Sequence, residues 1–209
     1  MNSKVTHINV GNLAENCWFL ANEDTKEAVV IDPGAEPDRI CAAAEKHGWK
    51  ITAILLTHGH IDHMGACESL RTELGVKVYA LTEEEDLLLD AKKNLSVFIE
   101  RKVVTFEPDE LLRDGQELTL AGMKIQGIHT PGHTPGGCSY YVADAGCVFS
   151  GDTLFAESVG RSDFPGGSTS ALVRAVKEKL FLLPDDTLVC PGHGEETTIG
   201  HEKKYNSFV

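Results

Sequence analysis

The sequence predicts an α/β fold in which two β-sheets pack against each other and helices cover their outer faces. Short strands rich in apolar and β-branched residues alternate with helices, and each half of the chain has a run of strands followed by a helix. No linker separates the halves, and 209 residues are enough for one sizeable core. We therefore expect residues 1–209 to form a single domain.

The first third of the chain is predicted to be a strand meander followed by a helix. Its strands are separated by polar turns and span residues 4–10, 16–21 and 27–31. Asp32-Pro33-Gly34 ends the third strand. The helix has Pro37 near its first turn, where proline is favoured, and Gly48 close to its end.

The middle of the chain continues this alternation. The apolar run at 51–56 predicts a buried strand, which leads into a histidine-rich loop. A helix over 64–74 is closed by Gly75, and a short strand follows at 76–81.

The next segment has a weaker pattern. Thr82 and Glu85 have the spacing of a capping box, which predicts a helix running to about Lys93. For residues 94–113 we expect a loop or a helical excursion that ends in a short strand near 103–106.

The second half of the chain repeats the order of strands followed by a helix. Four strands are predicted at residues 116–120, 123–129, 138–143 and 147–150. Ser168 has the side chain of an N-cap for a helix over 168–182. The remaining predicted elements are a last strand at 187–190 and a short helix that includes 203–207.

Composition excludes several classes of function. The formal net charge is −13, and because phosphate binding needs a basic face, we expect no nucleic-acid partner. No apolar run approaches the roughly 18 to 20 residues of a membrane span, and the N-terminus lacks a signal-peptide core, so we expect a cytoplasmic protein without a membrane partner. The six cysteines are scattered without a Cys-x-x-Cys motif, which predicts reduced core residues.

The densest chemistry in the sequence follows the strand at 51–56. His58 and His60 are two residues apart, so in extended backbone their rings can lie on one side and share one ion. Asp62 and His63 are adjacent, and the chain turns between them. This turn directs the pair toward the position of a second metal ion near the first. One loop therefore offers ligands to two metal ions. The alternative, a histidine-rich surface turn, is disfavoured by the apolar strand before the loop and by the glycines around it.

Three later loops share this pattern, a strand that ends in a glycine-rich turn with one metal-binding side chain. The side chains are His133 in Pro131-Gly132-His133-Thr134-Pro135-Gly136, Asp152 in Ser150-Gly151-Asp152-Thr153 and His193 in Pro191-Gly192-His193-Gly194. Each alone is compatible with a turn residue or a cap, but together with the first loop they complete two coordination shells. His129 competes with His133, which we prefer because flanking prolines fix its loop.

These motifs, in this order, resemble those of the metallo-β-lactamase-fold hydrolases, and specifically the short glyoxalase II-like branch. The quoted motifs are Thr-His-x-His-x-Asp-His, Pro-Gly-His-Thr-Pro-Gly, Ser-Gly-Asp-Thr and Pro-Gly-His-Gly. The resemblance spans nearly the whole chain. It implies an αββα sandwich of two mixed β-sheets with helices on the outer faces and a dinuclear metal site at one edge.

The resemblance also implies a role for each residue of the site. One metal would be bound by His58, His60 and His133, the other by Asp62, His63 and His193, with Asp152 bridging them. Asp32 matches the family's first-motif aspartate, which implies that it orients a metal ligand; the alternative is an Asp-Pro-Gly turn former. Mixed nitrogen and oxygen shells accept zinc, iron and manganese alike, and we expect two divalent ions, zinc before iron or manganese.

Two divalent ions predict a hydrolase that needs no serine or cysteine nucleophile. Cations about 3.5 to 4 Å apart share a water and lower its pKa from 15.7 toward roughly 7, which yields a hydroxide at neutral pH. Asp62 can orient that hydroxide as well as bind metal. A thiolate leaves readily, which suits the small-molecule thioester substrates that the resemblance implies, such as S-lactoylglutathione.

The substrate contact implied by the resemblance is Arg161. In glyoxalase II-like proteins a cation at this position contacts the substrate's carboxylate, and a planar guanidinium fits a carboxylate. The alternative is an exposed loop arginine. The chain ends soon after Tyr205, without the helical region that carries much of the glutathione-binding surface in the long enzymes. Thioester hydrolysis is therefore implied more firmly than a preference for lactoylglutathione.

Two other activities of the same fold stay open from the sequence. A persulfide dioxygenase would hold a single iron with His58, His133 and Asp152. A lactonase or other ester hydrolase would use the same hydroxide. His193 favours a two-metal hydrolase, because it is useful chiefly with a second metal. We expect a monomer or a small homo-oligomer.

Overall fold

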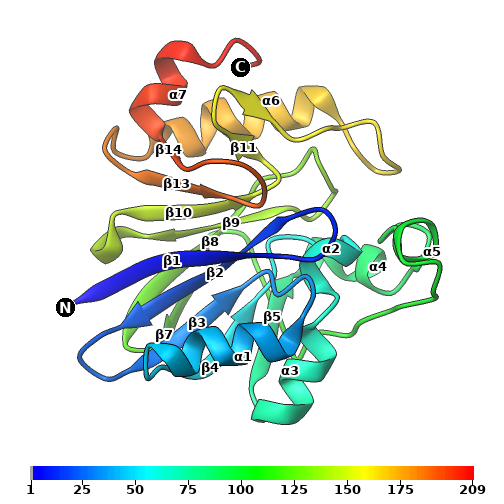
Figure 1. Ribbon diagram of the computed structural model, residues 1–209. Helices are drawn as coiled ribbons and strands as arrows, with labels where there is room; N and C mark the ends of the chain where they lie inside the picture. The colour runs from blue at the N-terminus through cyan, green and yellow to red at the C-terminus, as the bar shows by residue number, and fades with distance from the viewer. Residues whose placement is uncertain (1) are drawn as a thin grey trace.

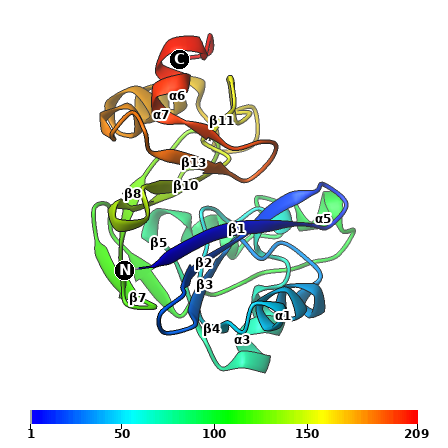
Figure 2. The ribbon, with the colours of Figure 1, turned by 60° about the vertical axis from the view of Figure 1, so that its left-hand side comes forward.

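The computed structural model describes residues 2–209 as two six-stranded β-sheets packed face to face. Figures 1 and 2 show helices outside both sheets, with α1 and α3 against the first sheet and α6 and α7 against the second. Both sheets mix parallel and antiparallel pairs. The αββα arrangement predicted from the sequence is therefore confirmed.

The first sheet is built from the N-terminal half of the chain. In spatial order its strands are β1 (Ser3–Val10), β2 (Glu15–Asn22), β3 (Glu27–Ile31), β4 (Lys50–Leu55), β5 (Lys77–Leu81) and β6 (Glu110–Leu112). The pairs β1–β2 and β2–β3 are antiparallel, whereas β3 to β6 run parallel. Helices α1 (Pro37–Lys46) and α3 (Cys67–Leu74) supply the crossovers between parallel strands.

The second sheet is built from the C-terminal half. Its strands, in spatial order, are β14 (Thr197–Thr198), β13 (Leu188–Pro191), β10 (Cys147–Gly151), β9 (Cys138–Val142), β8 (Met123–His129) and β7 (Glu117–Leu120). Its one parallel pair, β10–β13, is connected through α6 (Thr169–Glu178). Helix α7 (Ile199–Tyr205) follows β14, and a small hairpin of β11 (Leu154–Phe155) and β12 (Ser158–Val159) follows β10.

The main core lies between the two sheets, and strand alternation supplies it. On β2, Trp18 and Leu20 face the second sheet, while Phe19 packs into the separate core beneath α1 and α3. Trp18 meets Phe149 of β10 edge to face at 5.9 Å between ring centroids. Because strands such as β2 are buried on both faces, they read as continuous apolar runs rather than as an alternating pattern.

The topology brings loops of both sheets to one edge. The strands β3 and β4 are parallel neighbours in the first sheet, and β10 and β13 are parallel neighbours in the second. The loops that leave the carboxyl ends of parallel neighbours lie at the same edge of a sheet. Each of these four strands is followed by a residue that the sequence singled out as a candidate for the site.

Most predicted elements are confirmed, but three are wrong. The predicted helix over 64–74 is two helices, α2 (Ile61–Met64) and α3, so it begins inside the histidine loop. The predicted capping box fails because the Thr82 hydroxyl donates to Leu112 O instead, and α4 (Glu85–Leu88) ends well before Lys93. The strand expected near 103–106 is absent from the described residues, because 103–106 lie in a loop between α5 (Ser96–Ile99) and β6.

The Ser168 cap is confirmed, and the cysteine prediction is confirmed for five of the six residues. Within the described part of the chain the six cysteines are free thiols, and all except Cys41 are buried. The Ser168 hydroxyl accepts from Ala171 N at the start of α6. Across residues 2–209, no helix combines the length and apolar character needed to cross a bilayer.

A buried hydrogen bond across the core provides a test of the fold. The Tyr140 hydroxyl on β9 donates to Leu56 O at 2.8 Å, just before the histidine loop. We expect Tyr140→Phe to lower the free energy of unfolding by about 1–3 kcal/mol, because it leaves a buried carbonyl without a donor. Urea denaturation would measure this. Tyr205→Phe, at a residue that is 53% exposed, should change the same quantity by less than about 0.5 kcal/mol. Equal effects of the two changes would contradict the assigned contact.

Candidate metal centre

The histidine loop begins where β4 ends and continues into the short helix α2. His58 and His60 lie in the non-helical part, and His60 has extended backbone angles before the first turn of α2. Asp62 and His63 lie on that helical turn. The expected turn between Asp62 and His63 is thus a single turn of helix. All three histidines are buried, with exposed fractions of 3% or less.

The first cluster joins His58 and His60 to His133 from the loop after β8. One potential ligand atom from each residue lies within 4.8 Å of the others. His60 Nδ1 is 3.0 Å from His133 Nε2, and His58 Nε2 is buried without a hydrogen-bond partner. Burial and the neighbouring His133 lower the pKa of His60 to about 3. Its imidazole is therefore neutral at physiological pH, the form that binds metals.

The second cluster consists of Asp62, His63 and His193, again with ligand atoms within 4.8 Å. His193 Nε2 lies 3.3 Å from Asp62 Oδ2, and the buried His63 Nε2 has no hydrogen-bond partner. Burial alone would raise the pKa of Asp62, but attraction to His63 and His193 holds that pKa well below its usual value. The Asp62 side chain is therefore a carboxylate at neutral pH.

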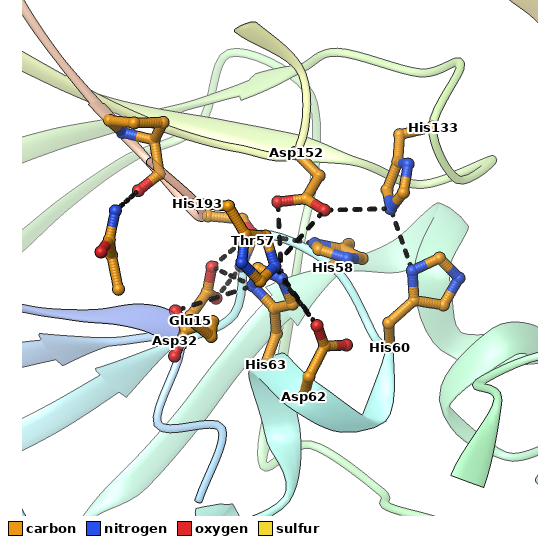
Figure 3. A network of polar contacts seen from close by, with 12 residues as sticks. Glu15, Asp32, Thr57, His58, His60, Asp62, His63, His133, Asp152 and His193 are labelled. Atoms are coloured by element: carbon orange, nitrogen blue, oxygen red, sulfur yellow. Dashed lines mark hydrogen bonds and ion pairs between the residues drawn. The ribbon is translucent and has the colours of Figure 1, made fainter. Parts of the chain in front are cut away.

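Asp152 lies between the two clusters. Its Oδ1 is 3.5 Å from His63 Nε2, while its Oδ2 is 3.6 Å from His133 Nε2. Figure 3 shows the carboxylate directed into the space between the rings of the two clusters. Oδ1 is buried without a hydrogen-bond partner. Oδ2 also lies 3.9 Å from His193 Nε2 of the second cluster, so the carboxylate as a whole is within reach of both clusters.

Asp32 and Thr57 support members of both clusters from behind. Asp32 Oδ2 accepts from the Thr57 hydroxyl at 2.6 Å and lies 2.9 Å from His63 Nδ1. The same Thr57 hydroxyl is 3.1 Å from His58 Nδ1. Burial alone would lower the pKa of His63, but the carboxylates of Asp152, Asp62 and Asp32 raise it well above its usual value. The Asp32 carboxylate therefore contacts the imidazole of His63 directly and that of His58 through Thr57, in addition to its place in the Asp-Pro-Gly turn.

The structure separates His133 from its competitor. His129 Nε2 is 2.8 Å from Pro135 O, and the residue is not part of either cluster. His133 is turned into the centre and held there by a 2.7 Å contact between its Nδ1 and Arg161 O. The prolines beside His133 and the carbonyl of Arg161 together fix the ring's direction.

Several residues of the centre were missed in the sequence. Thr57 joins Asp32 to His58, and Glu15 on β2 is a fully buried carboxylate whose Oε1 lies 3.9 Å from His63 Nδ1. Burial raises the pKa of Glu15 well above its usual value. The available signal for Glu15 was a charged residue two positions before the apolar run 17–21, which the structure places in a strand buried at every position.

A pocket of about 430 Å³ opens onto both clusters. Most of its wall area is apolar, and its lining is Leu13, His60, Asp62, Leu95, Ile99, His133, Asp152, Phe155, Arg161, Phe164 and His193. Arg161 lies 4.0 Å from the Phe164 ring and forms a fork with both oxygens of Asp163 at 2.7 Å. The guanidinium expected to contact substrate therefore lies at the pocket, where it already pairs with a carboxylate of its own chain.

The donor atoms fit divalent cations. Imidazole nitrogens and carboxylate oxygens are the ligands of zinc, iron and manganese sites. Three of the atoms that face the two clusters, His58 Nε2, His63 Nε2 and Asp152 Oδ1, are buried without a hydrogen-bond partner. Since buried polar atoms normally have a partner, these atoms point to a group that the polypeptide itself does not supply.

Comparisons with known proteins identify the family of the chain. A family model described as the metallo-beta-lactamase superfamily matches residues 10–193. The probable metallo-hydrolase YqgX of Bacillus subtilis is 39% identical over 201 residues, which cover 96% of this chain and 94% of that protein. Hydroxyacylglutathione hydrolase GloC of Haemophilus influenzae is 36% identical over 197 residues, with 93% and 92% covered.

Solved structures agree over nearly the whole chain. BLEG-1 B3 metallo-beta-lactamase superposes with a TM-score of 0.93 at 38% identity, covering 98% of this chain and 99% of that one. TTHA1623 in a di-iron-bound form gives 0.86 at 36% identity, with 98% and 100% covered. ETHE1 from Myxococcus xanthus gives 0.78 at 30% identity, with 99% and 84% covered.

The position of Asp32 predicts a measurable effect on metal affinity. Its carboxylate can accept a hydrogen bond from the Nδ1–H of His63, which leaves Nε2 free for a metal. Asp32→Asn places an amide donor there, so we expect divalent-metal affinity to fall by about 10- to 100-fold. Competition with a chelator would measure it. Asp38→Asn, at an exposed position on α1, should leave the metal affinity unchanged. An unchanged metal affinity in Asp32→Asn would exclude the orienting role of Asp32.

Proposed function

The chain belongs to the metallo-β-lactamase superfamily, and from that premise we propose a dinuclear metallohydrolase that cleaves thioesters such as S-lactoylglutathione. The observation that carries the proposal is the pair of three-residue clusters, with the carboxylate of Asp152 between them. The name of the GloC relative supports the choice of substrate class.

In this proposal each cluster holds one divalent ion. The ligands of the first are His58, His60 and His133, the ligands of the second are Asp62, His63 and His193, and Asp152 bridges them. Such ions activate a water and polarise a carbonyl when they are bound. The ionised Asp62 lines the pocket, so its carboxylate can orient the attacking water. We favour zinc, with iron or manganese as the alternatives.

The pocket supports a small thioester as substrate. Its apolar wall of Leu13, Ile99 and Phe164 suits an acyl or thioether chain, and Arg161 is the cation among its lining residues. A thiol has a pKa near 8.5, so its thiolate is a stable leaving group that needs no proton donor. An amide nitrogen leaves only when a general acid protonates it. This difference favours thioesters over amides for this site.

Three other reactions of the fold compete with this proposal, and one of them is the hydrolysis of lactones or other esters by the same site. The similarity to BLEG-1 B3 metallo-beta-lactamase makes a β-lactam the second candidate substrate. A dioxygenase with a single iron is disfavoured, because it would not need Asp62 and His193 to meet within 3.3 Å. A panel of S-lactoylglutathione, other thioesters, lactones, β-lactams and glutathione persulfide, run beside elemental analysis, separates these reactions.

The metal assignment gives the first prediction about activity. Protein loaded with zinc, iron or manganese should hydrolyse S-lactoylglutathione. The loss of thioester absorbance would measure this hydrolysis. His60→Ala should abolish this turnover, because it removes one ligand of the first cluster. His47→Ala, an exposed residue stacked on Trp49, is the matched control and should keep full activity. Turnover that survives His60→Ala would reject the two-metal assignment.

Arg161 gives the second prediction. We propose that its guanidinium exchanges Asp163 for the carboxylate of the substrate. Arg161→Gln should then raise KM for S-lactoylglutathione at least about tenfold, while kcat changes much less, since a charged hydrogen bond is worth about 1.5–3 kcal/mol. Steady-state kinetics would measure both constants. Arg174→Gln, on the exposed side of α6, should change neither, and an unaltered KM in Arg161→Gln would exclude the contact.

A further inference from the structure

One buried carboxylate outside the two clusters contacts the loops that carry the first of them. Glu84 is the last residue of a short 3-10 helix, η1 (Thr82–Glu84), and is 1% exposed. Its Oε1 accepts from Gly59 N at 2.8 Å, and its Oε2 accepts from Gly136 N, also at 2.8 Å. Gly59 lies between His58 and His60, and Gly136 belongs to the loop of His133.

These two loops belong to different sheets. The His58–His60 loop follows β4 in the first sheet, and the His133 loop follows β8 in the second. Near the strands, Cys138 N donates to Thr57 O at 2.7 Å. Farther out, Glu84 links the loops through one side chain. The carboxylate thus spans the gap across which the first cluster must assemble.

The fit around Glu84 is close enough to set this distance. A Cβ placed on Gly136 would lie 2.1 Å from the backbone nitrogen of Glu84, so only glycine permits the approach. A Cβ on Gly59 would lie 2.8 Å from a methyl group of Leu88. Within residues 2–209, the hydrogen bonds that Glu84 accepts come from these loops and none comes from a member of the second cluster.

We infer that Glu84 is a positioning residue that sets the separation of the two loops and thereby the affinity of the first metal site. The inference rests on the proposed two-metal function and extends it to a residue that touches neither metal nor substrate. A carboxylate offers two acceptors to two N–H donors, whereas a glutamine of the same shape offers one acceptor and one NH₂ donor. With glutamine at this position, the N–H of either Gly59 or Gly136 must face the side-chain NH₂ group. Because both groups are donors, the loop that carries that glycine must move away.

The test is site-resolved metal binding by Glu84→Gln. Metal-free protein is titrated with Zn²⁺ against a chelator at pH 8, because burial raises the pKa of Glu84 to about 7. His60→Ala and His193→Ala identify which binding step belongs to which cluster. Glu84→Gln should weaken the first-cluster step by roughly 10- to 100-fold and leave the second within about threefold.

Glu202→Gln is the matched control for the loss of a buried carboxylate. Glu202 is 0% exposed and accepts from Glu157 N at 2.9 Å, from the Asn206 amide at 2.8 Å and from the Thr197 hydroxyl at 2.6 Å. This variant should lose stability in urea yet bind both ions as the parent does. Weakening of both steps by Glu84→Gln, or equal weakening by the two variants, would overturn the inference, because either result reports general destabilisation.

A second variant keeps the test decisive if Glu84→Gln does not fold. The carboxylate of Glu84→Asp is one methylene shorter and cannot reach both glycine N–H groups, so the first-cluster step should still weaken, with Glu202→Asp as its control. An unchanged first step in Glu84→Asp overturns the inference. If the parent protein binds two ions and the Glu84 variants bind them equally well, only the role of Glu84 is rejected. If the parent protein binds fewer than two ions, the proposed function is rejected.

Discussion

The electrostatics of one small buried volume constrain the whole structure. Carboxylates of Asp32, Asp62 and Asp152 lie within a few ångströms of imidazoles such as His63, largely away from water. Burying charged or polar groups is costly unless they are paired with opposite charge or bound to metal. Every loop that enters this volume must therefore aim its polar atoms inward with little freedom, and the surrounding fold has to hold it there.

The pairing of two sheets provides that rigidity. Loops from both halves of the chain reach the centre, and some of them are hydrogen-bonded to the opposite sheet as well as to their own strand. The loop of His193 is an example, because Asn16 and Trp18 on β2 both donate to Pro191 O, at 3.0 and 2.9 Å. Asn16 also donates to Gly194 O at 3.0 Å. The first sheet thus holds a ligand-bearing loop of the second on both sides of the histidine.

Close backbone approach is the cost of this convergence. A Cβ on Gly192 would lie 2.4 Å from Asp152 Oδ1 and 2.6 Å from a carbon of the His63 ring. The glycine-rich character of the loops therefore follows from the space that the polar side chains occupy. The charged pair at the rim of the pocket is less constrained than the buried centre. The side chains of Arg161 and Asp163 are 59% and 68% exposed, so water can replace either partner of this pair.

The sequence by itself determined the order of strands and helices, the two-sheet architecture and the identity of the loops that carry imidazoles and carboxylates. It could do so because apolar periodicity and short glycine-rich motifs are local properties of the chain. Only the tertiary structure decided that Asp62 and His63 lie on a helical turn, that Thr57 joins Asp32 to His58, and that Glu15 and Glu84 lie buried beside the centre. These features depend on contacts between residues distant in sequence, and for a single buried carboxylate no local pattern states which backbone groups will surround it.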